Sequence, residues 1–170
     1  MESVTSLANE NRLICLMNQY EKDLLRMCSV YLQDRSLAED AVQETFLKAY
    51  RGLSAFRGDC SEKTWLTSIA INTCKNMRRN AWFRFVERNV SLERLPAPAP
   101  SAGEGSVAVT REVMLLPHKQ REAVLLYYYQ ELTEKEIARA LNISCAAVSK
   151  RLKKARARLH IALEGGAENE

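Results

Sequence analysis

The chain has 170 residues, enough for one ordinary domain or two small ones, and its formal net charge is +4. Its 46% of hydrophobic residues excludes an intrinsically disordered protein, and its 27% of charged residues is typical of a globular protein in water. No apolar run approaches the roughly 20 residues of a membrane span, and the N-terminal MESVTSLANENR lacks the basic and apolar regions of a secretory signal, so we expect a cytoplasmic protein without stable membrane insertion.

The charge is unevenly distributed along the chain. Residues 1–60 hold seven Lys or Arg and nine Asp or Glu, whereas residues 61–100 hold seven and three. Residues 131–170 hold eight and six, and every basic side chain there precedes Leu159. An acidic segment followed by two basic ones predicts two kinds of partner, because the first suits a basic protein surface and the others suit a polyanion such as DNA.

Apolar residues at helical spacing predict a helix over residues 10–33 and a second one that starts near Ser36 and ends near Leu53. Ser36 is a plausible N-cap for the second helix, with Glu39 three residues further on. The face of this helix opposite its apolar stripe carries Leu37, Asp40, Glu44 and Leu47, with Gln43 at its edge.

Two interpretations of this face remain open. Carboxylates beside exposed leucines favour a contact surface for a basic partner. An ordinary solvated face, with Glu44 and Lys48 as an i,i+4 ion pair, explains the same pattern. Periodicity alone does not separate the two.

Residues 52–63, GLSAFRGDCSEK, predict a loop, because Gly, Ser and Asp break the helical pattern. The next helix runs from about Ser61 to Asn80, with Trp65 and Leu66 among its core residues. A polar loop followed by a basic helix face fits nucleic acid and could hold an unpaired base, whereas a solvated helix is the alternative. The far side of the helix carries Ser68, Ile71, Asn72, Lys75, Arg78 and Arg79.

Residues 95–106, LPAPAPSAGEGS, are dominated by Pro, Ala, Ser and Gly and predict a flexible linker. With its flanking residues the linker spans 89–107. It separates an N-terminal domain at residues 10–88 from a C-terminal domain at residues 108–163.

The segment 133–159 predicts a helix-turn-helix. Thr133 and Glu136 form a capping box for the first helix, Asn142 begins the turn, and Ser144 caps the second helix. A helical hairpin with a solvated basic face is the alternative. After Leu159 the chain turns acidic and is expected to fray.

The second helix of this motif has two distinct faces. Small residues at its N-terminal end let the backbone approach a DNA groove closely, and the Lys and Arg residues around them can meet phosphates. The apolar stripe consists of Val148, Leu152, Ala155 and Leu159. The opposite face carries Ala146, Lys150 and Lys153, flanked by Ser149 and Lys154.

The cysteines give little support for a metal site or a cofactor. None forms a CxxC pair, and only His118 and His160 could assist them, which is a poor zinc pattern. We expect reduced, partly buried thiols and no metal or cofactor; a redox switch at Cys60 or Cys74 is the alternative. The five positions are Cys15, Cys28, Cys60, Cys74 and Cys145.

Three motifs in register resemble a bacterial sigma factor. These are AEDAVQETFLKAY (38–50), FRGDCSEKTWLTSIAINTCKNMRR (56–79) and the segment from LPHKQREAVLLYYYQ through the helix-turn-helix (116–159). The chain is similar to the extracytoplasmic-function (ECF) subfamily of the sigma-70 family, which keeps conserved regions 2 and 4. The resemblance implies an all-α protein of two small helical domains and covers residues from about 13 to 160.

The resemblance also implies roles for the N-terminal residues. The segment with Asp40, Gln43 and Glu44 corresponds to the one that docks on the clamp helices of the β′ subunit of RNA polymerase, with Phe46 packing underneath. This favours the contact-surface interpretation, and the exposed Leu47 belongs to the same face. The loop Phe56–Lys63 corresponds to the element that captures a flipped base of the −10 promoter region, and the following helix to the one that supports strand opening. The −10 candidates are Arg57, Gly58, Asp59, Ser61, Lys63, Asn72, Lys75, Arg78 and Arg79.

In the C-terminal domain, the second helix of the motif corresponds to the one that enters the major groove of the −35 element. Two stretches depart from the family pattern: Ala146–Leu152 stands where Gly-Thr-Val-Lys-Ser-Arg-Leu is frequent, and Ile71-Asn72 stands where Arg-Asn is usual. The −35 candidates are Ser144, Ala146, Ser149, Lys150, Arg151, Lys153 and Lys154.

The sequence therefore predicts a transcription initiation factor. Its expected partners are core RNA polymerase, through the β′ clamp helices and the β flap, promoter DNA, and a cognate anti-sigma factor. A DNA-binding repressor or activator would leave the acidic N-terminal face unexplained, and a protein-interaction module would leave the basic helix unexplained. An enzyme is disfavoured, because no nucleophile–base set, paired acids or phosphate loop occurs.

Overall fold

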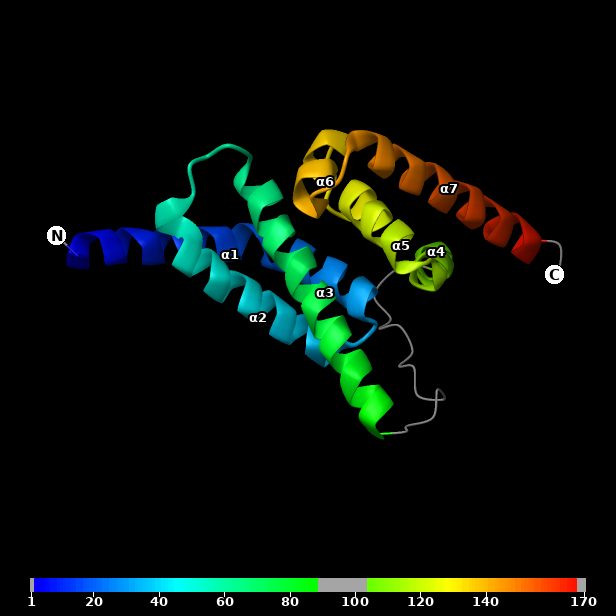
Figure 1. Cartoon of the computed structure of the whole chain (residues 1–170), viewed down its shortest axis with the longest axis horizontal. Helices are drawn as coiled ribbons and strands as arrows, with labels where there is room; N and C mark the ends of the chain where they lie inside the picture. The colour runs from blue at the N-terminus through cyan, green and yellow to red at the C-terminus, as the bar shows by residue number, and fades with distance from the viewer. Residues whose placement is uncertain (1, 89–103, 168–170) are drawn as a thin grey trace.

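The computed structural model describes residues 2–88 and 104–167, and its side chains over 7–80 and 108–164; the predicted linker at 89–107 lies mostly outside these ranges. Helices account for all regular secondary structure in this part of the chain, which confirms the predicted all-α class. The elements, shown in Figure 1, are α1 (Glu2–Leu32), α2 (Arg35–Gly52), a 3₁₀ turn (Leu53–Ala55), α3 (Glu62–Arg88), α4 (Glu104–Leu115), α5 (His118–Val124), a π-helical turn (Leu125–Tyr129), α6 (Glu134–Leu141) and α7 (Cys145–Ala167).

Helices α1, α2 and α3 pack into one bundle (Figure 1). The apolar stripe of each helix, read from its 3.6-residue period, is the face that is buried. Leu24 and Met27 of α1, Phe46 of α2 and Leu66 of α3 are each at most 4% exposed. Burying such side chains contributes roughly 1.5–3 kcal/mol each before the cost of ordering the chain.

The C-terminal helices α4 to α7 form a second packed group. Leu125, Ile137, Val148 and Leu152 are fully buried in it. The π-helical turn at the end of α5 adds a residue to the helical repeat, which changes the direction in which the side chains after Val124 project. Among the described residues no helix is both long and apolar enough to cross a bilayer.

Several helix ends differ from their predicted positions. Asp34, not Ser36, caps α2: its carboxylate accepts a hydrogen bond from the Leu37 backbone N–H at 2.8 Å. Asp and Ser are about equally good N-cap residues, so the sequence alone could not decide whether Asp34 or Ser36 caps α2. The helix that starts at Cys145 does not end near Leu159 but continues to Ala167.

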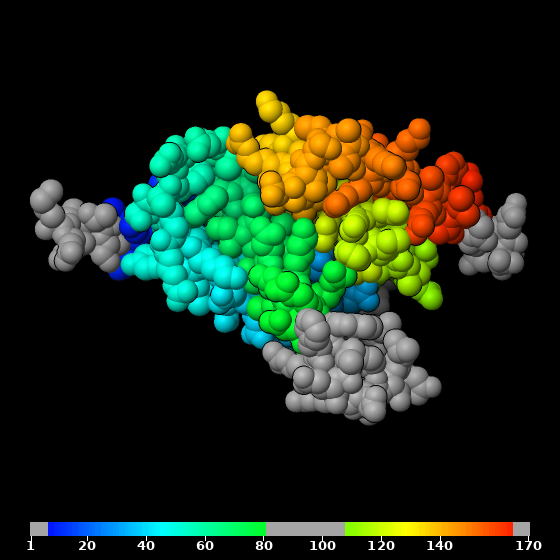
Figure 2. Space-filling model, viewed as in Figure 1, coloured from blue at the N-terminus to red at the C-terminus, as the bar shows by residue number. Residues whose placement is uncertain are grey.

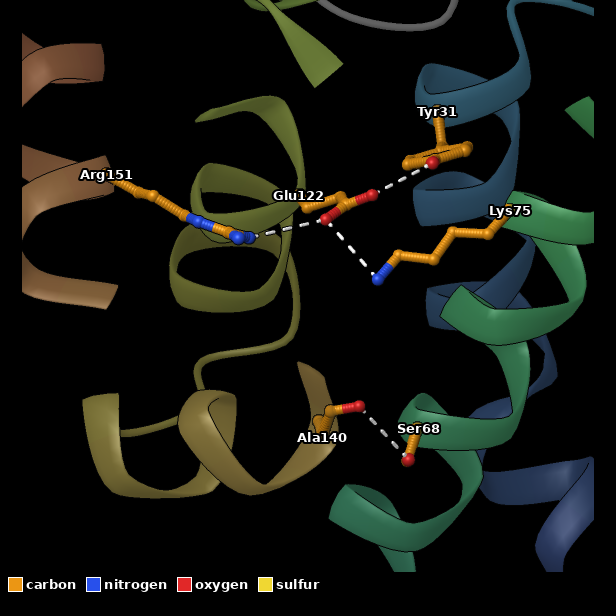
Figure 3. A network of polar contacts seen from close by, with 6 residues as sticks. All are labelled: Tyr31, Ser68, Lys75, Glu122, Ala140 and Arg151. Atoms are coloured by element: carbon orange, nitrogen blue, oxygen red, sulfur yellow. Dashed lines mark hydrogen bonds and ion pairs between the residues drawn. The ribbon is translucent and has the colours of Figure 1, made fainter. Parts of the chain in front are cut away.

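The two groups of helices are packed against each other. Figure 1 shows α6 beside α3, and in Figure 2 the yellow to orange surface of this region lies directly against the green surface of α3. An ion pair between Lys75 of α3 and Glu122 also joins α3 to α5 (Figure 3). This packing corrects one expectation for α3. Ile71, predicted on an open face, is fully buried, and Ser68 and Lys75 are half-buried.

Candidate DNA-binding and protein-binding surfaces

The face of α2 opposite its core stripe is open to solvent. Asp40 and Gln43 are exposed and Leu47 is 53% exposed, whereas Phe46 is 4% exposed beneath them. Glu44 pairs with Lys48 at 3.4 Å, as predicted for an i,i+4 pair. This face borders a groove of about 360 Å³ between α2 and α3, whose α3 wall is Thr73, Asn76, Met77 and Asn80.

The predicted loop forms one wall of a larger pocket, of about 720 Å³, against α2 and α3. The rings of Phe56 and Trp65 are stacked with their centroids 4.6 Å apart. The Arg12 guanidinium lies 5.7 Å from the Phe56 centroid and forms an ion pair with Glu62 at 2.7 Å, which holds this aromatic pair from the α1 side. Polar groups enter the pocket from Lys48, Arg57, Asp59, Asn72 and Thr73.

The loop residues divide into pocket-lining and structural positions. Arg57 and Asp59 are exposed and line the pocket. Gly58 has φ +75°, a conformation that an L side chain would strain, and so sets the direction of the loop. The hydroxyl of Ser61 accepts a hydrogen bond from the Thr64 backbone N–H at 3.1 Å and so caps α3. Gly58, Ser61 and Lys63 are not among the residues that line this pocket.

The remaining −10 candidates on α3 do not form one open strip. Asn72 is exposed and lines the pocket, and Arg79 is exposed beside Asn76. Lys75, in contrast, forms an ion pair with Glu122 of α5 at 3.5 Å. The guanidinium of Arg78 is 5.8 Å from the centroid of the Tyr31 ring. The C-terminal helices therefore cover the middle of this face.

The helix-turn-helix has the predicted local structure. Thr133 and Glu136 form a complete capping box, with the Thr133 N–H donating to the Glu136 carboxylate at 2.8 Å. This backbone hydrogen bond, together with the Thr133 hydroxyl, lowers the pKa of Glu136. Asn142 adopts φ +53° at the turn, and Ser144 caps α7 by accepting from the Ala147 N–H at 3.1 Å.

The two faces of α7 are as predicted, except at Arg151. Val148, Leu152 and Ala155 are fully buried. Arg151 points toward α5, is 21% exposed and lies 3.5 Å from the Glu122 carboxylate. The other −35 candidates are exposed: Ser144, Ala146, Ser149, Lys150, Lys153 and Lys154.

Sequence reasoning missed several residues of these sites. Glu122 and Tyr31 link the two groups of helices, and Tyr128 accepts a hydrogen bond from the Arg156 guanidinium at 2.9 Å. A Glu within an amphipathic helix carries no local signal that it will be buried. Trp65 was assigned to the core only, yet its ring also lines the pocket.

The cysteines are all free thiols. Cys28 and Cys74 are fully buried in the N-terminal bundle, and their mutual hydrogen bond and burial raise the pKa of Cys28. A thiol held protonated in this way is a poor nucleophile. In the described part of the chain no cluster of His, Cys, Asp and Glu is suited to a metal ion.

Comparisons with known proteins agree with this geometry. The sigma-70 region 2 family matches residues 16–84, and the sigma-70 region 4 family matches residues 106–159. The RNA polymerase sigma-H factor of Pseudomonas aeruginosa is 31% identical over 163 residues, which cover 88% of this chain and 84% of the relative. The chain belongs to the sigma-70 family.

Within the family it is an ECF sigma factor. The ECF sigma factor SigM of Mycobacterium tuberculosis strain H37Rv is 32% identical over 146 residues, covering 85% of this chain and 73% of SigM. The fold is that of RpoE of Bartonella quintana in its complex with NepR, with a TM-score of 0.73, 21% identity and coverage of 91% and 96%. As an ECF sigma factor, the protein binds core RNA polymerase, directs it to promoters and assists their melting.

Proposed function

We propose that the open face of α2 is where this sigma factor binds core polymerase. The observation that carries the proposal is that Asp40, Gln43 and Leu47 are exposed together above a buried Phe46. Carboxylates around an exposed leucine complement the basic and apolar surface expected of the β′ clamp helices. The C-terminal domain contacts the β flap in the same complex.

The pocket beside the loop receives a base flipped from the −10 element. The stacked rings of Phe56 and Trp65 offer an aromatic wall, and Asp59 and Asn72 offer hydrogen-bonding groups for a base edge. A pocket of about 720 Å³ has room for one nucleotide base together with water. The exposed Arg79 extends the path for the strand along α3.

The exposed face of α7 reads the −35 element. Lys150 and Lys153 stand opposite the buried stripe and face the bases, whereas Lys154 contacts phosphates. The proposed domains are residues 10–88 and 108–163, joined by the linker at 89–107. Their relative position on DNA is set by polymerase.

The protein itself performs no chemistry and needs no cofactor, because the catalytic metal belongs to polymerase. It acts in the cytoplasm, where it meets the polymerase. Two solved structures of similar fold are complexes: one holds the sigma factor RpoE with the anti-sigma factor NepR, and the other holds CnrH with the cytosolic domain of CnrY. A cognate anti-sigma factor is the corresponding partner of this chain.

Charge reversal on α2 tests the polymerase assignment. Asp40→Lys or Glu44→Lys places like charges at the interface, which costs several kcal/mol, so co-purification with core polymerase should be lost while helix content is unchanged. Glu21→Lys is the matched control, since Glu21 is likewise exposed but belongs to α1 and not to α2. Normal co-purification of the α2 variants with core polymerase would show that this face of α2 does not bind polymerase.

A further inference from the structure

Arg12 of α1 contacts the aromatic wall of the proposed −10 pocket from outside the pocket. Its Nε and Nη2 atoms both donate to Oε1 of Glu62, at 3.0 and 2.7 Å. The same guanidinium lies 5.7 Å from the centroid of the Phe56 ring. The residues that line the pocket come from α2, the loop and α3, so Arg12 brings a further helix, α1, into contact with the pocket wall.

Phe56 lies where the chain leaves the 3₁₀ turn and enters the loop. Its backbone N–H donates to the Leu53 carbonyl at 3.3 Å, and its half-buried ring stacks on Trp65. Trp65 is fixed against the end of α2, where a Cβ on Gly52 would lie 3.2 Å from its ring. Because a half-buried ring in a loop keeps rotamer freedom, the contact with Arg12 narrows the orientations that Phe56 samples.

The chemistry of Arg12 suits this position. A guanidinium over an aromatic ring is attracted by the negative face of the ring. Glu62 lies in the first turn of α3, where the helix dipole favours a carboxylate, and it holds the guanidinium in place. The Arg12 and Glu62 side chains are 45% and 35% exposed, and an ion pair this exposed contributes little to global stability. A local positioning role therefore explains the arrangement better than stabilisation of the fold.

The family comparison does not assign a role to Arg12. The match to sigma-70 region 2 begins at residue 16, and Arg12 precedes it. The contact with Phe56 is therefore a feature of this chain that the region 2 pattern does not describe.

We propose that Arg12 is a positioning residue for base capture: held by Glu62, it fixes the Phe56 ring so that Phe56 and Trp65 present a preformed aromatic face to the base flipped from the −10 element. The inference rests on the proposed −10 pocket. A ring that is already ordered loses less conformational entropy when a base stacks on it, so a preformed face binds the base more tightly. Arg12 acts through Phe56 and reads no base itself.

The test is Arg12→Ala in the full-length protein, assembled with core polymerase and assayed by transcription from promoter libraries randomised in the −10 or the −35 element. We expect base preference at one −10 position to fall about two- to fivefold, the scale of an exposed cation–aromatic contact, with −35 preference unchanged. Phe56→Leu removes the ring but keeps an apolar side chain, and should reduce preference at the same position. Arg12→Ala should add little to Phe56→Leu, because both changes act through one ring.

Two further variants separate positioning from other roles of an arginine. Glu62→Gln releases Arg12 without removing its charge, and should weaken the same base preference. If Arg12 instead bound a DNA phosphate, Glu62→Gln would strengthen promoter binding, and Arg12→Ala would weaken all sequences alike and reduce the salt dependence. Arg26→Ala is the matched control, since Arg26 is also on α1 and lies 4.9 Å from a ring centroid, that of Tyr129. It should leave the −10 profile unchanged.

The results for these variants separate the inference from the proposed function. Loss of preference at the Phe56-dependent position in both Arg12→Ala and Glu62→Gln supports the positioning role. An unchanged −10 profile in Arg12→Ala, or an equal loss for all sequences, overturns it; Glu62→Gln decides in its place should Arg12→Ala not fold. A loss in Arg12→Ala alone overturns the part assigned to Glu62. If Phe56→Leu also leaves the −10 profile unchanged, the pocket does not receive the base and the proposed function fails.

Discussion

Three glutamates of this sigma factor have different roles because their surroundings differ. Glu44 lies on an open helix face beside Lys48, where an ion pair contributes only about 0.3–0.5 kcal/mol. Glu122 is buried and joins two domains. Glu136 closes the capping box of α6 and also accepts from the Thr64 hydroxyl at 3.2 Å.

The capping box predicts a pH-dependent contribution to stability. Glu136→Gln should lower the free energy of unfolding by roughly 0.3–1.5 kcal/mol at pH 7. The pKa of Glu136 is lower in the folded state, so this difference is fully present above the unfolded pKa of about 4.3 and disappears as the pH falls through the folded pKa. Urea denaturation at pH 7 and pH 3 measures it, with Glu134→Gln, in the same helical turn but outside the capping box, as the control.

At the scale of single elements, α7 has two opposite faces with different roles. One face packs in the core, and the other is the proposed DNA-binding face. Val148, Leu152 and Ala155 hold it against α5, while Lys150 and Lys153 are exposed. Arg156 is fixed by hydrogen bonding and stacking with Tyr127 and Tyr128, which orients the helix without using its exposed face.

The proposed roles of the lysines on α7 predict that replacing Lys150 and replacing Lys154 will affect DNA binding differently. Lys150→Ala should relax preference at one position of the −35 element and cost about 1–3 kcal/mol, since a base contact is lost. Lys154→Ala should weaken binding to all sequences alike and reduce its salt dependence, as expected for a phosphate contact. Selection from a library with a randomised −35 element distinguishes the two, and an unaltered preference in Lys150→Ala would contradict the base-reading assignment.

The loop between α2 and α3 is an element with one proposed task. Replacing residues 57–62 by an unrelated loop should change −10 preference, because Arg57 and Asp59 line the base pocket, and should leave core binding and −35 preference unchanged. Transcription from libraries randomised in either element measures this. If the loop is a passive connector, the graft alters thermal stability but not promoter choice.

At the scale of the whole molecule, the packing of the two groups of helices leaves one proposed binding surface open and covers part of another. The α2 face stays open, whereas the middle of the α3 face is covered. We expect a purified fragment containing the β′ clamp helices to bind wild-type protein and Glu122→Gln with affinities that agree within about twofold, because no contact of that face changes. Isothermal titration calorimetry measures both affinities; a large gain for Glu122→Gln would mean that the packing of the two groups of helices also hides the polymerase face.

Local patterns in the sequence were sufficient to predict the helices, the helix-turn-helix and the family. The stripe of Val148, Leu152 and Ala155 and the capping box of Thr133 and Glu136 involve residues within one or two helical turns of each other. Such interactions depend on spacing along the chain, which the sequence displays directly. The exposed α2 face and the loop pocket were likewise located from their residues and the family resemblance.

The packing of the two domains was decided only in three dimensions. Tyr31, Lys75, Glu122 and Arg151 come from four helices, and periodicity shows which helix face is polar without showing what lies against it. For this reason Ile71 was assigned to an open face, and Glu122 was not singled out at all. The burial of Ile71 and the charge balance around Glu122 depend on which surfaces of the two domains meet, and that choice depends on shape and charge over the whole interface.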